Sequence, residues 1–178
     1  MAVGERLANV GPIIQELTAL TTLPWQVVLL RLAGALVLCG LIGLERETKS
    51  RPAGLRTHML VGLAAALYCL IMLEVLANMD SYSDRVSSDP LRLVNAVTNG
   101  VAFLAAGMIV FSQGKVRGIT TGTSLWLAAA IGLSVGFGFW MMAVATTLLA
   151  LLVIRVLKLG EIRAAGGDSD HASDTETN

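Results

Sequence analysis

The sequence has little charge, and the charge it has is unevenly placed. From Gly118 to Ile154 there is no Lys, Arg, Asp, Glu or His. This run is too long for one bilayer crossing, which takes roughly 20 apolar residues, and it suits two short crossings joined by a tight turn. Gly132, Gly136 and Gly138 mark the expected turn. A soluble domain would interrupt such a run with charge, so the sequence predicts an integral membrane protein.

Composition agrees with this prediction. Only 15% of the 178 residues are charged and 54% are apolar, and the mean hydropathy of +0.70 lies far from ordinary soluble usage. The formal net charge is zero. That value indicates no class of partner, because the charges are sorted by loop and are not spread evenly.

Other absences argue against catalysis. The sequence shows no cluster of metal-ligating residues, no glycine-rich phosphate loop and no Ser/His/Asp triad at usable spacing. Cys39 and Cys69 both lie within apolar runs, where a lone thiol is usually a small packing residue. We therefore expect a protein that is not an enzyme, that needs no cofactor and that has no nucleic-acid partner.

Three further apolar stretches precede the long uncharged run. Together they predict an all-α integral membrane protein with a transmembrane domain over residues 24–158. Four crossings remain possible if the last stretch enters and leaves the bilayer on the same side. The five expected transmembrane helices cover about residues 24–44, 57–77, 93–112, 118–134 and 139–157.

Lysines and arginines predict the orientation. Nine of them lie in the loops after the first and third expected spans and at the C-terminal flank, whereas Arg6 and Arg85 lie on the other side. Basic residues are retained in the cytoplasm, so we expect the N-terminus outside and the C-terminus inside. The nine are Arg46, Lys49, Arg51, Arg56, Lys115, Arg117, Arg155, Lys158 and Arg163.

The two ends of the chain carry separate expectations. Residues 1–23 lack the features of a secretory signal, and the apolar residues from Val10 to Leu17 have helical spacing. They predict a short amphipathic helix on the outer leaflet. Residues 159–178 are rich in Asp, Gly, Ser and Thr, which predicts a disordered acidic tail in the cytoplasm.

An internal similarity links two parts of the chain. Residues 54–58 (GLRTH) precede residues 63–67 (LAAAL), and residues 118–122 (GITTG) precede residues 127–131 (LAAAI) at the same spacing. This pattern predicts that the first two helices recur as the third and fourth, in a parallel repeat about an axis along the membrane normal. The alternative is chance recurrence of an alanine-rich pattern in an apolar protein.

Three ionisable residues fall within or near the expected spans. Arg31 lies inside the first, Glu74 near the outer end of the second, and Arg92 at the start of the third, just after Asp89 and Pro90. A charge at membrane depth is costly unless it is paired or reaches the interface. Arg31 is thus either held by a structural partner or part of a functional pathway, and Arg92 is either an interfacial anchor or functional. Glu74 is a plausible partner for either arginine.

The third expected span carries a polar stripe. Five residues follow helical spacing along it: Arg92, Asn95, Asn99, Ala102 and Ala106. Because lipid penalises exposed carboxamides, this stripe is expected to face protein or water. It is either hydrogen-bonding glue between closely packed helices or a polar surface for permeation or ligand sensing.

Charged and hydroxyl groups gather at the expected cytoplasmic ends of the first two helices, which we call the inner mouth. Glu45 lies roughly on the same helical face as Arg31, and His58 follows the first basic loop. A carboxylate, a histidine and threonines together could bind a cation or respond to pH near neutrality. A solvated loop that only fixes topology is the alternative.

Four sequence blocks occur in a characteristic order: GLIGLERE at 40–47, PAGLRTH at 52–58, GVAFLAAG at 100–107 and VRGITT at 116–121, followed by Leu125 and Trp126. In order and spacing these blocks resemble the MgtC/SapB family of bacterial inner-membrane proteins. The resemblance covers about residues 31–157. Ala102 and Ala105 stand where that family usually shows glycine.

The resemblance implies a multi-pass protein linked to growth under magnesium limitation, and in pathogens to virulence. It further implies action on another membrane complex, such as the ATP synthase, and no magnesium transport by the protein itself. The chain is expected to be a short form without the family's C-terminal cytoplasmic domain. The family's blocks map onto candidate residues near the cytoplasmic face: Glu45, Arg46, Arg56, Thr57, His58, Arg117, Thr120 and Thr121.

Two functions follow from these observations. The first is a non-enzymatic regulator that binds another membrane complex and adjusts ion or proton homeostasis. The second is a small homo-oligomeric transporter or channel for ions or solutes, with a polar path along the third helix. Whether magnesium binds directly is left open by the sequence.

Overall fold

The computed structural model describes residues 21–47, 53–78, 89–112 and 115–167. Within these ranges the chain forms five helices and one short hairpin, which confirms the all-α membrane class. The elements are α3 (Trp25–Glu47), α4 (Leu55–Ala77), α5 (Pro90–Met108), β1 (Val110–Ser112), β2 (Lys115–Arg117), α6 (Ile119–Phe137) and α7 (Trp140–Gly167).

Four of these helices, α3 to α6, are each long and apolar enough to cross a membrane. The apolar part of α7, Trp140–Val156, is shorter. The protein is therefore a multi-pass membrane protein.

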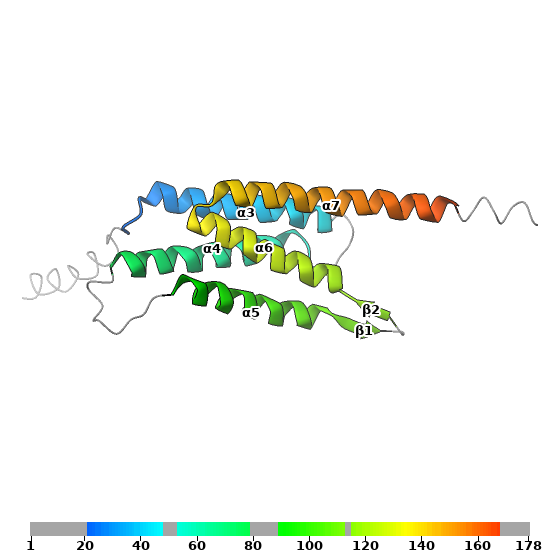
Figure 1. The fold of residues 1–178 in the computed structure, drawn as a ribbon, viewed down its shortest axis with the longest axis horizontal. Coiled ribbons are helices and arrows are strands. Elements are labelled where there is room, and N and C mark those ends of the chain that lie inside the picture. The colour runs from blue at the N-terminus through cyan, green and yellow to red at the C-terminus, as the bar shows by residue number, and fades with distance from the viewer. Residues whose placement is uncertain (1–20, 48–52, 79–88, 113–114, 168–178) are drawn as a thin grey trace, which may run out of the picture.

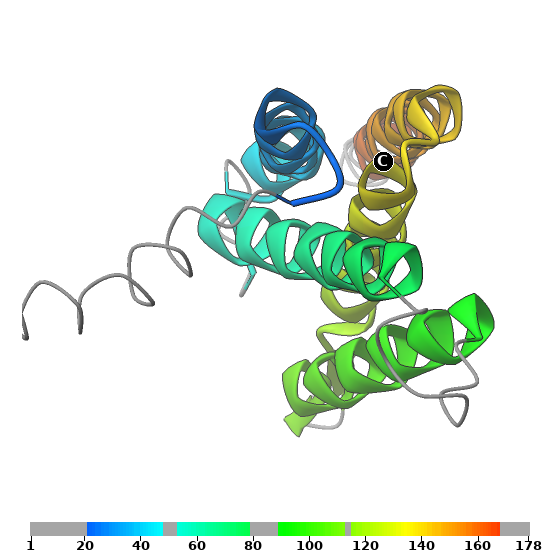
Figure 2. The same ribbon diagram turned by 90° about the vertical axis from the view of Figure 1, so that its left-hand side faces the viewer.

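Successive helices run in opposite directions along the long axis of the molecule (Figure 1). α6 packs against each of the other four helices. Viewed from the end, α5 lies at the edge of the bundle, on the side away from α3 and α7 (Figure 2). We call the end that holds the α3–α4 connection and the β1–β2 hairpin the basic end, and the opposite end, where α6 meets α7, the far end.

The centre of the bundle is a close crossing of α4 and α6. A Cβ added at Gly132 of α6 would collide with the carbonyl oxygen of Gly62 in α4. The two cysteines lie in the same region: the thiol of Cys39 donates to the carbonyl of Ala128 at 3.3 Å, and that of Cys69 donates to the carbonyl of Leu133 at 3.5 Å. Both thiols are free and buried. Small residues let the two backbones touch, as in other membrane bundles.

The bounds of α5 differ from the expected span of 93–112. The helix begins at Pro90 because Asp89 is its N-cap, accepting a hydrogen bond from the Leu91 amide at 2.9 Å. It ends at Met108, since the chain turns extended at Ile109 and enters β1, which pairs antiparallel with β2. The β-branched and aromatic residues around Phe111 favour this strand, which the sequence pattern did not predict.

The other helices also extend beyond their expected bounds of 24–44, 57–77, 118–134 and 139–157. Most of these differences are within three residues, but α7 continues to Gly167. Residues 159–167 were expected in the disordered tail, and this part of that prediction is wrong. Residues 168–178, like residues 1–20, lie outside the described residues, so the expectations for both ends stay predictions.

The turn between α6 and α7 uses one of the three glycines expected there. Gly138 adopts a left-handed conformation, with φ of 87°, and caps the C-terminus of α6. Gly132 and Gly136 instead lie within α6, where they pack against α4. The membrane orientation and the internal repeat stay predictions; Lys49 and Arg51 lie outside the described residues.

Candidate functional site at the basic end

The end of α3 packs closely against the start of α4 at the basic end. A Cβ on Gly43 would lie 2.7 Å from the Cα of Leu55 and 3.1 Å from the Cβ of His58. Gly54, the N-cap of α4, has no side chain to offer the first amides of the helix. The Glu47 carboxylate takes this role and accepts a hydrogen bond from the Leu55 amide at 2.9 Å.

His58 joins α4 to α6 within this end. Its side chain is fully buried. Nδ1 lies 2.8 Å from the carbonyl oxygen of Gly54, and Nε2 lies 3.0 Å from the hydroxyl of Ser124 in α6. Because a carbonyl can only accept, Nδ1 carries a proton and donates it to Gly54.

Ser124 has one hydroxyl proton and two neighbours that can accept it. Its Oγ lies 2.8 Å from the carbonyl of Thr121 and 3.0 Å from Nε2 of His58. With a neutral imidazole, Ser124 can donate to only one of them. With a doubly protonated imidazole, His58 donates to Ser124 and Ser124 donates to Thr121, so both contacts become hydrogen bonds. One proton thus distinguishes two hydrogen-bonding states at the α4–α6 junction.

The eight candidate residues of the cytoplasmic face divide into two groups. Three are buried: Arg46, 6% exposed, His58 and Thr121. Four are exposed, namely Arg56, Thr57, Arg117 and Thr120, and Glu45 is half-buried. Of the buried group, His58 links α4 to α6 through Ser124. The exposed group presents charge and hydroxyls at the surface of this end.

Two residues of the site were missing from the sequence-based candidates. Ser124 lies only three residues after Thr121, but its role depends on α6 crossing α4 at His58, which no local pattern reveals. Glu47 lies well before the start of α4, outside the first turn in which an acidic residue is a capping signal. It is separated from Leu55 by eight residues, so only the folded connection brings them together.

No set of cation ligands is assembled among the described residues. Within residues 21–47, 53–78, 89–112 and 115–167, no three His, Cys, Asp or Glu side chains gather. Both ring nitrogens of His58 already have protein partners. The described part of the mouth therefore fits a hydrogen-bonding role for His58 better than metal ligation.

Arg31 has a structural partner at the far end. Its Nη1 donates to the carbonyl oxygen of Gly136 at 2.8 Å. Gly136 belongs to the last turn of α6, where carbonyl groups lack helical partners and a positive charge is favoured. Arg31 thus caps α6, and the expected pairing with Glu74 is wrong.

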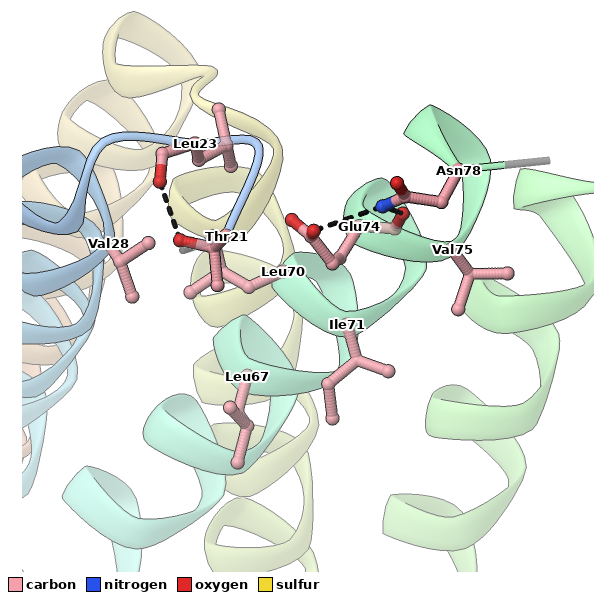
Figure 3. A pocket seen from close by; sticks show the side chains of 9 residues that line it. All are labelled: Thr21, Leu23, Val28, Leu67, Leu70, Ile71, Glu74, Val75 and Asn78. Atoms are coloured by element: carbon pink, nitrogen blue, oxygen red, sulfur yellow. Dashed lines mark hydrogen bonds between the residues drawn. The ribbon is translucent and has the colours of Figure 1, made fainter. Parts of the chain in front are cut away.

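Glu74 is engaged by other groups. Its carboxylate accepts hydrogen bonds from the amide and hydroxyl of Thr22, at 2.9 and 2.6 Å, and from the side-chain amide of Asn78 at 3.0 Å. It lies beside a pocket of about 260 Å³ in which the segment before α3 meets the end of α4 (Figure 3). Apart from Glu74, Thr21 and Asn78, this pocket is lined by apolar side chains. Glu74 therefore fixes the chain ahead of α3 and pairs with neither arginine.

The polar stripe of α5 faces away from the rest of the described chain. All five of its residues are exposed: Arg92, Asn95, Asn99, Ala102 and Ala106. The opposite side of the helix, around the buried Val101, packs on the bundle. No described helix of the chain covers the stripe, so its two interpretations, as hydrogen-bonding glue between helices and as a polar surface, stay predictions.

Comparison with known proteins relates the chain to a single protein family. The model of the MgtC family matches residues 32–161. Similar curated proteins include "Putative magnesium transporter YhiD" of Escherichia coli (strain K12), 37% identical over 128 residues, which are 72% of this chain and 59% of that protein. "Protein SapB" of Bacillus subtilis is 34% identical over 131 residues, 73% of this chain and 56% of SapB.

"Protein MgtC" of Brucella abortus (strain 2308) is 38% identical over 130 residues, 71% of this chain and 50% of MgtC. The chain thus spans between half and three fifths of the length of these relatives. No solved structure matches. One of the three is named a putative magnesium transporter, and the names of the other two, Protein SapB and Protein MgtC, state no activity.

Proposed function

This chain belongs to the MgtC family, and from that premise we propose that it is a non-enzymatic regulator in the bacterial inner membrane. It binds another membrane complex, such as the ATP synthase, and adjusts ion or proton homeostasis when magnesium is scarce. In a pathogen the same activity would contribute to virulence.

The observation that carries this proposal is the division of the candidate residues at the basic end. The exposed residues Arg56, Thr57, Arg117 and Thr120 come from α4, β2 and α6, so one partner surface can contact three elements. Exposed arginines are enriched in protein–protein interfaces, and side chains carried on packed helices are held more precisely than side chains on loops. Beneath them, the contact of Gly132 with Gly62 brings α4 and α6 backbone to backbone, which favours a rigid support for that surface.

Affinity capture from membranes tests the regulator proposal. The full chain, crosslinked in native membranes and then purified in detergent, should recover one membrane partner in stoichiometric amount. An Arg56→Ala/Arg117→Ala variant should lose that partner while its folding is unchanged, because both side chains are exposed. Repeated recovery of the protein alone would contradict the proposal.

Arg155→Ala is the matched control, since Arg155 is an exposed arginine on α7. It should retain the partner. A growth assay makes the result physiological: a deletion strain should grow poorly at low magnesium or altered pH, and the control variant should restore growth where the double variant does not. If both variants restored growth equally, binding of the captured partner would not be required for the function.

A small transporter is the second candidate. The exposed carboxamides of Asn95 and Asn99 support it, because they could line a polar path if copies of the chain enclosed them. One relative is named a putative magnesium transporter, which supports the same reading. Reconstituted liposomes should then show cation flux that Asn99→Leu abolishes; the absence of flux for magnesium, protons and monovalent cations would exclude it.

A further inference from the structure

The exposed side of α5 carries the most unusual surface among the described helices. Asn99 is the central residue of this 19-residue helix, so it lies at the depth farthest from water on either side. Asn95 is one turn closer to the far end, and both side chains are exposed. A carboxamide left without partners in hydrocarbon is costly.

Most other side chains on the exposed side of α5 are small. Ala102 and Ala106 are exposed, and a Cβ added at Gly100 or Gly107 would meet no atom within 4 Å. Phe103, which lies between Ala102 and Ala106 in the sequence, is 79% exposed. Small residues beside carboxamides are what closely packed membrane helices present to one another, yet no described helix of this chain covers them.

We propose that this face of α5 binds the α5 of a second copy of the chain, in a parallel homodimer with its two-fold axis along the membrane normal. The proposal goes beyond the function proposed above and does not depend on it. The occupant follows from the chemistry of the face. An asparagine side chain both donates and accepts hydrogen bonds, and a parallel two-fold axis places each residue opposite its own copy at the same depth.

Charge supports the same occupant. Arg92 alone would repel its copy at the two-fold axis. Asp89 lies three residues earlier, at the N-cap of α5, and both side chains are exposed. In a two-fold dimer each arginine can pair with the partner's aspartate, so the face is complementary to itself from its charged end to its small-residue end.

Cysteine crosslinking in native membranes tests the interface without destabilising the fold. Asn99→Cys should give a disulfide-linked dimer on mild oxidation. Leu104→Cys is the control, because Leu104 is exposed on the same helix, roughly 140° around from Asn99 at about 100° per residue. The native Cys39 and Cys69 are buried and stay in place.

Strong self-crosslinking at position 99 and little at 104 would support the dimer. Equal crosslinking at both positions, none at 99, or a product of 99 with a different protein would overturn it. Counting fluorescent subunits in dilute liposomes gives a second readout. There the wild-type chain should be dimeric and Asn95→Leu/Asn99→Leu should weaken the dimer by about tenfold or more; a monomeric wild type, or a double variant as dimeric as wild type, would also overturn the proposal.

Discussion

α5 and α6 have the same length of 19 residues and equal mean hydropathy in their most apolar windows, yet they occupy opposite environments. Within the described chain, 61% of the α6 window is buried and only 11% of the α5 window is. α6 touches all four other helices, whereas α5 lies at the edge (Figure 2). Average hydropathy therefore predicts that both enter the membrane and says nothing about which one forms the core.

The difference lies in the kind of small and polar residues each helix carries. α6 has glycines where α4 crosses it, and its polar groups bond locally: the hydroxyl of Ser134, for example, donates to the carbonyl of Ala130 at 2.9 Å. α5 carries carboxamides. Each has two N–H donors and an acceptor oxygen, and its own helix offers fewer partners for these than for a single hydroxyl, so a carboxamide needs a hydrogen-bonding partner outside the helix. The following substitutions break or sharpen this contrast, from the largest expected effect to the smallest.

Glycine substitutions should affect α6 far more than α5. Gly132→Ala forces a Cβ against the backbone of Gly62, and we expect a loss of about 3 kcal/mol or more, since overpacking against backbone cannot be relieved by a rotamer change. Gly100→Ala in α5 meets open space and should be neutral or stabilising by up to about 1 kcal/mol. Thermal unfolding in detergent measures both. Similar losses in the two variants would contradict a close backbone contact between Gly132 and Gly62.

Removing Arg31 should destabilise the far end of α6. Arg31→Met leaves the Gly136 carbonyl without its charged donor, at an expected cost of about 1.5–3 kcal/mol. Arg56→Met removes an arginine that is exposed, and should change stability by no more than about 0.5 kcal/mol. Denaturation of both variants in the same detergent measures the two changes. An Arg31→Met protein with unchanged stability would mean that the cap is dispensable.

Ser124→Ala tests the junction between His58 and α6. The substitution leaves Nε2 of a fully buried imidazole without its partner, and we expect a loss of about 1–2 kcal/mol. Thr123→Ala is the neighbouring control, because Thr123 is exposed and its hydroxyl bonds only to the carbonyl of Thr120 in its own helix. If Thr123→Ala lost as much stability as Ser124→Ala, the loss would come from helix propensity and not from the His58 contact.

The smallest effect is expected at Glu74. Glu74→Gln weakens its bonds to Thr22 at an exposed position, so the unfolding midpoint should fall less than for Ser124→Ala. Local hydrogen exchange is the better readout, because the amide of Thr22 should lose protection while amides in the middle of α4 do not. Unchanged exchange at Thr22 would show that other contacts hold the segment before α3.

Much of the fold could be predicted from the sequence because lipid imposes strict rules on it. Long apolar runs had to become helices, which correctly gave the fold class and the approximate positions of five helices. The ends were less accurate where local and longer-range preferences compete. Asp89 and Pro90 start α5 earlier than the apolar pattern does, and the chain around Phe111 leaves the helix for a strand.

The candidate site was predictable in part. The sequence pointed to His58 and Thr121 at one end of the helices, and both lie there, buried. It could not identify Ser124 as the partner of His58, nor Gly136 as the partner of Arg31, because residues 66 and 105 positions apart meet only through the crossing of helices. It was also unable to say which side of α5 packs on the bundle.

The sequence by itself determined that this chain belongs in a bilayer, since uncharged runs of such length are stable only where water is excluded. It also determined where helices must begin, wherever a capping residue or a proline precedes an apolar run. Only the tertiary structure decided that α6 is the core and α5 the edge, because that choice depends on which helix surfaces allow backbones to touch. The same choice left the carboxamides of α5 facing outward, where their hydrogen-bonding needs require another molecule.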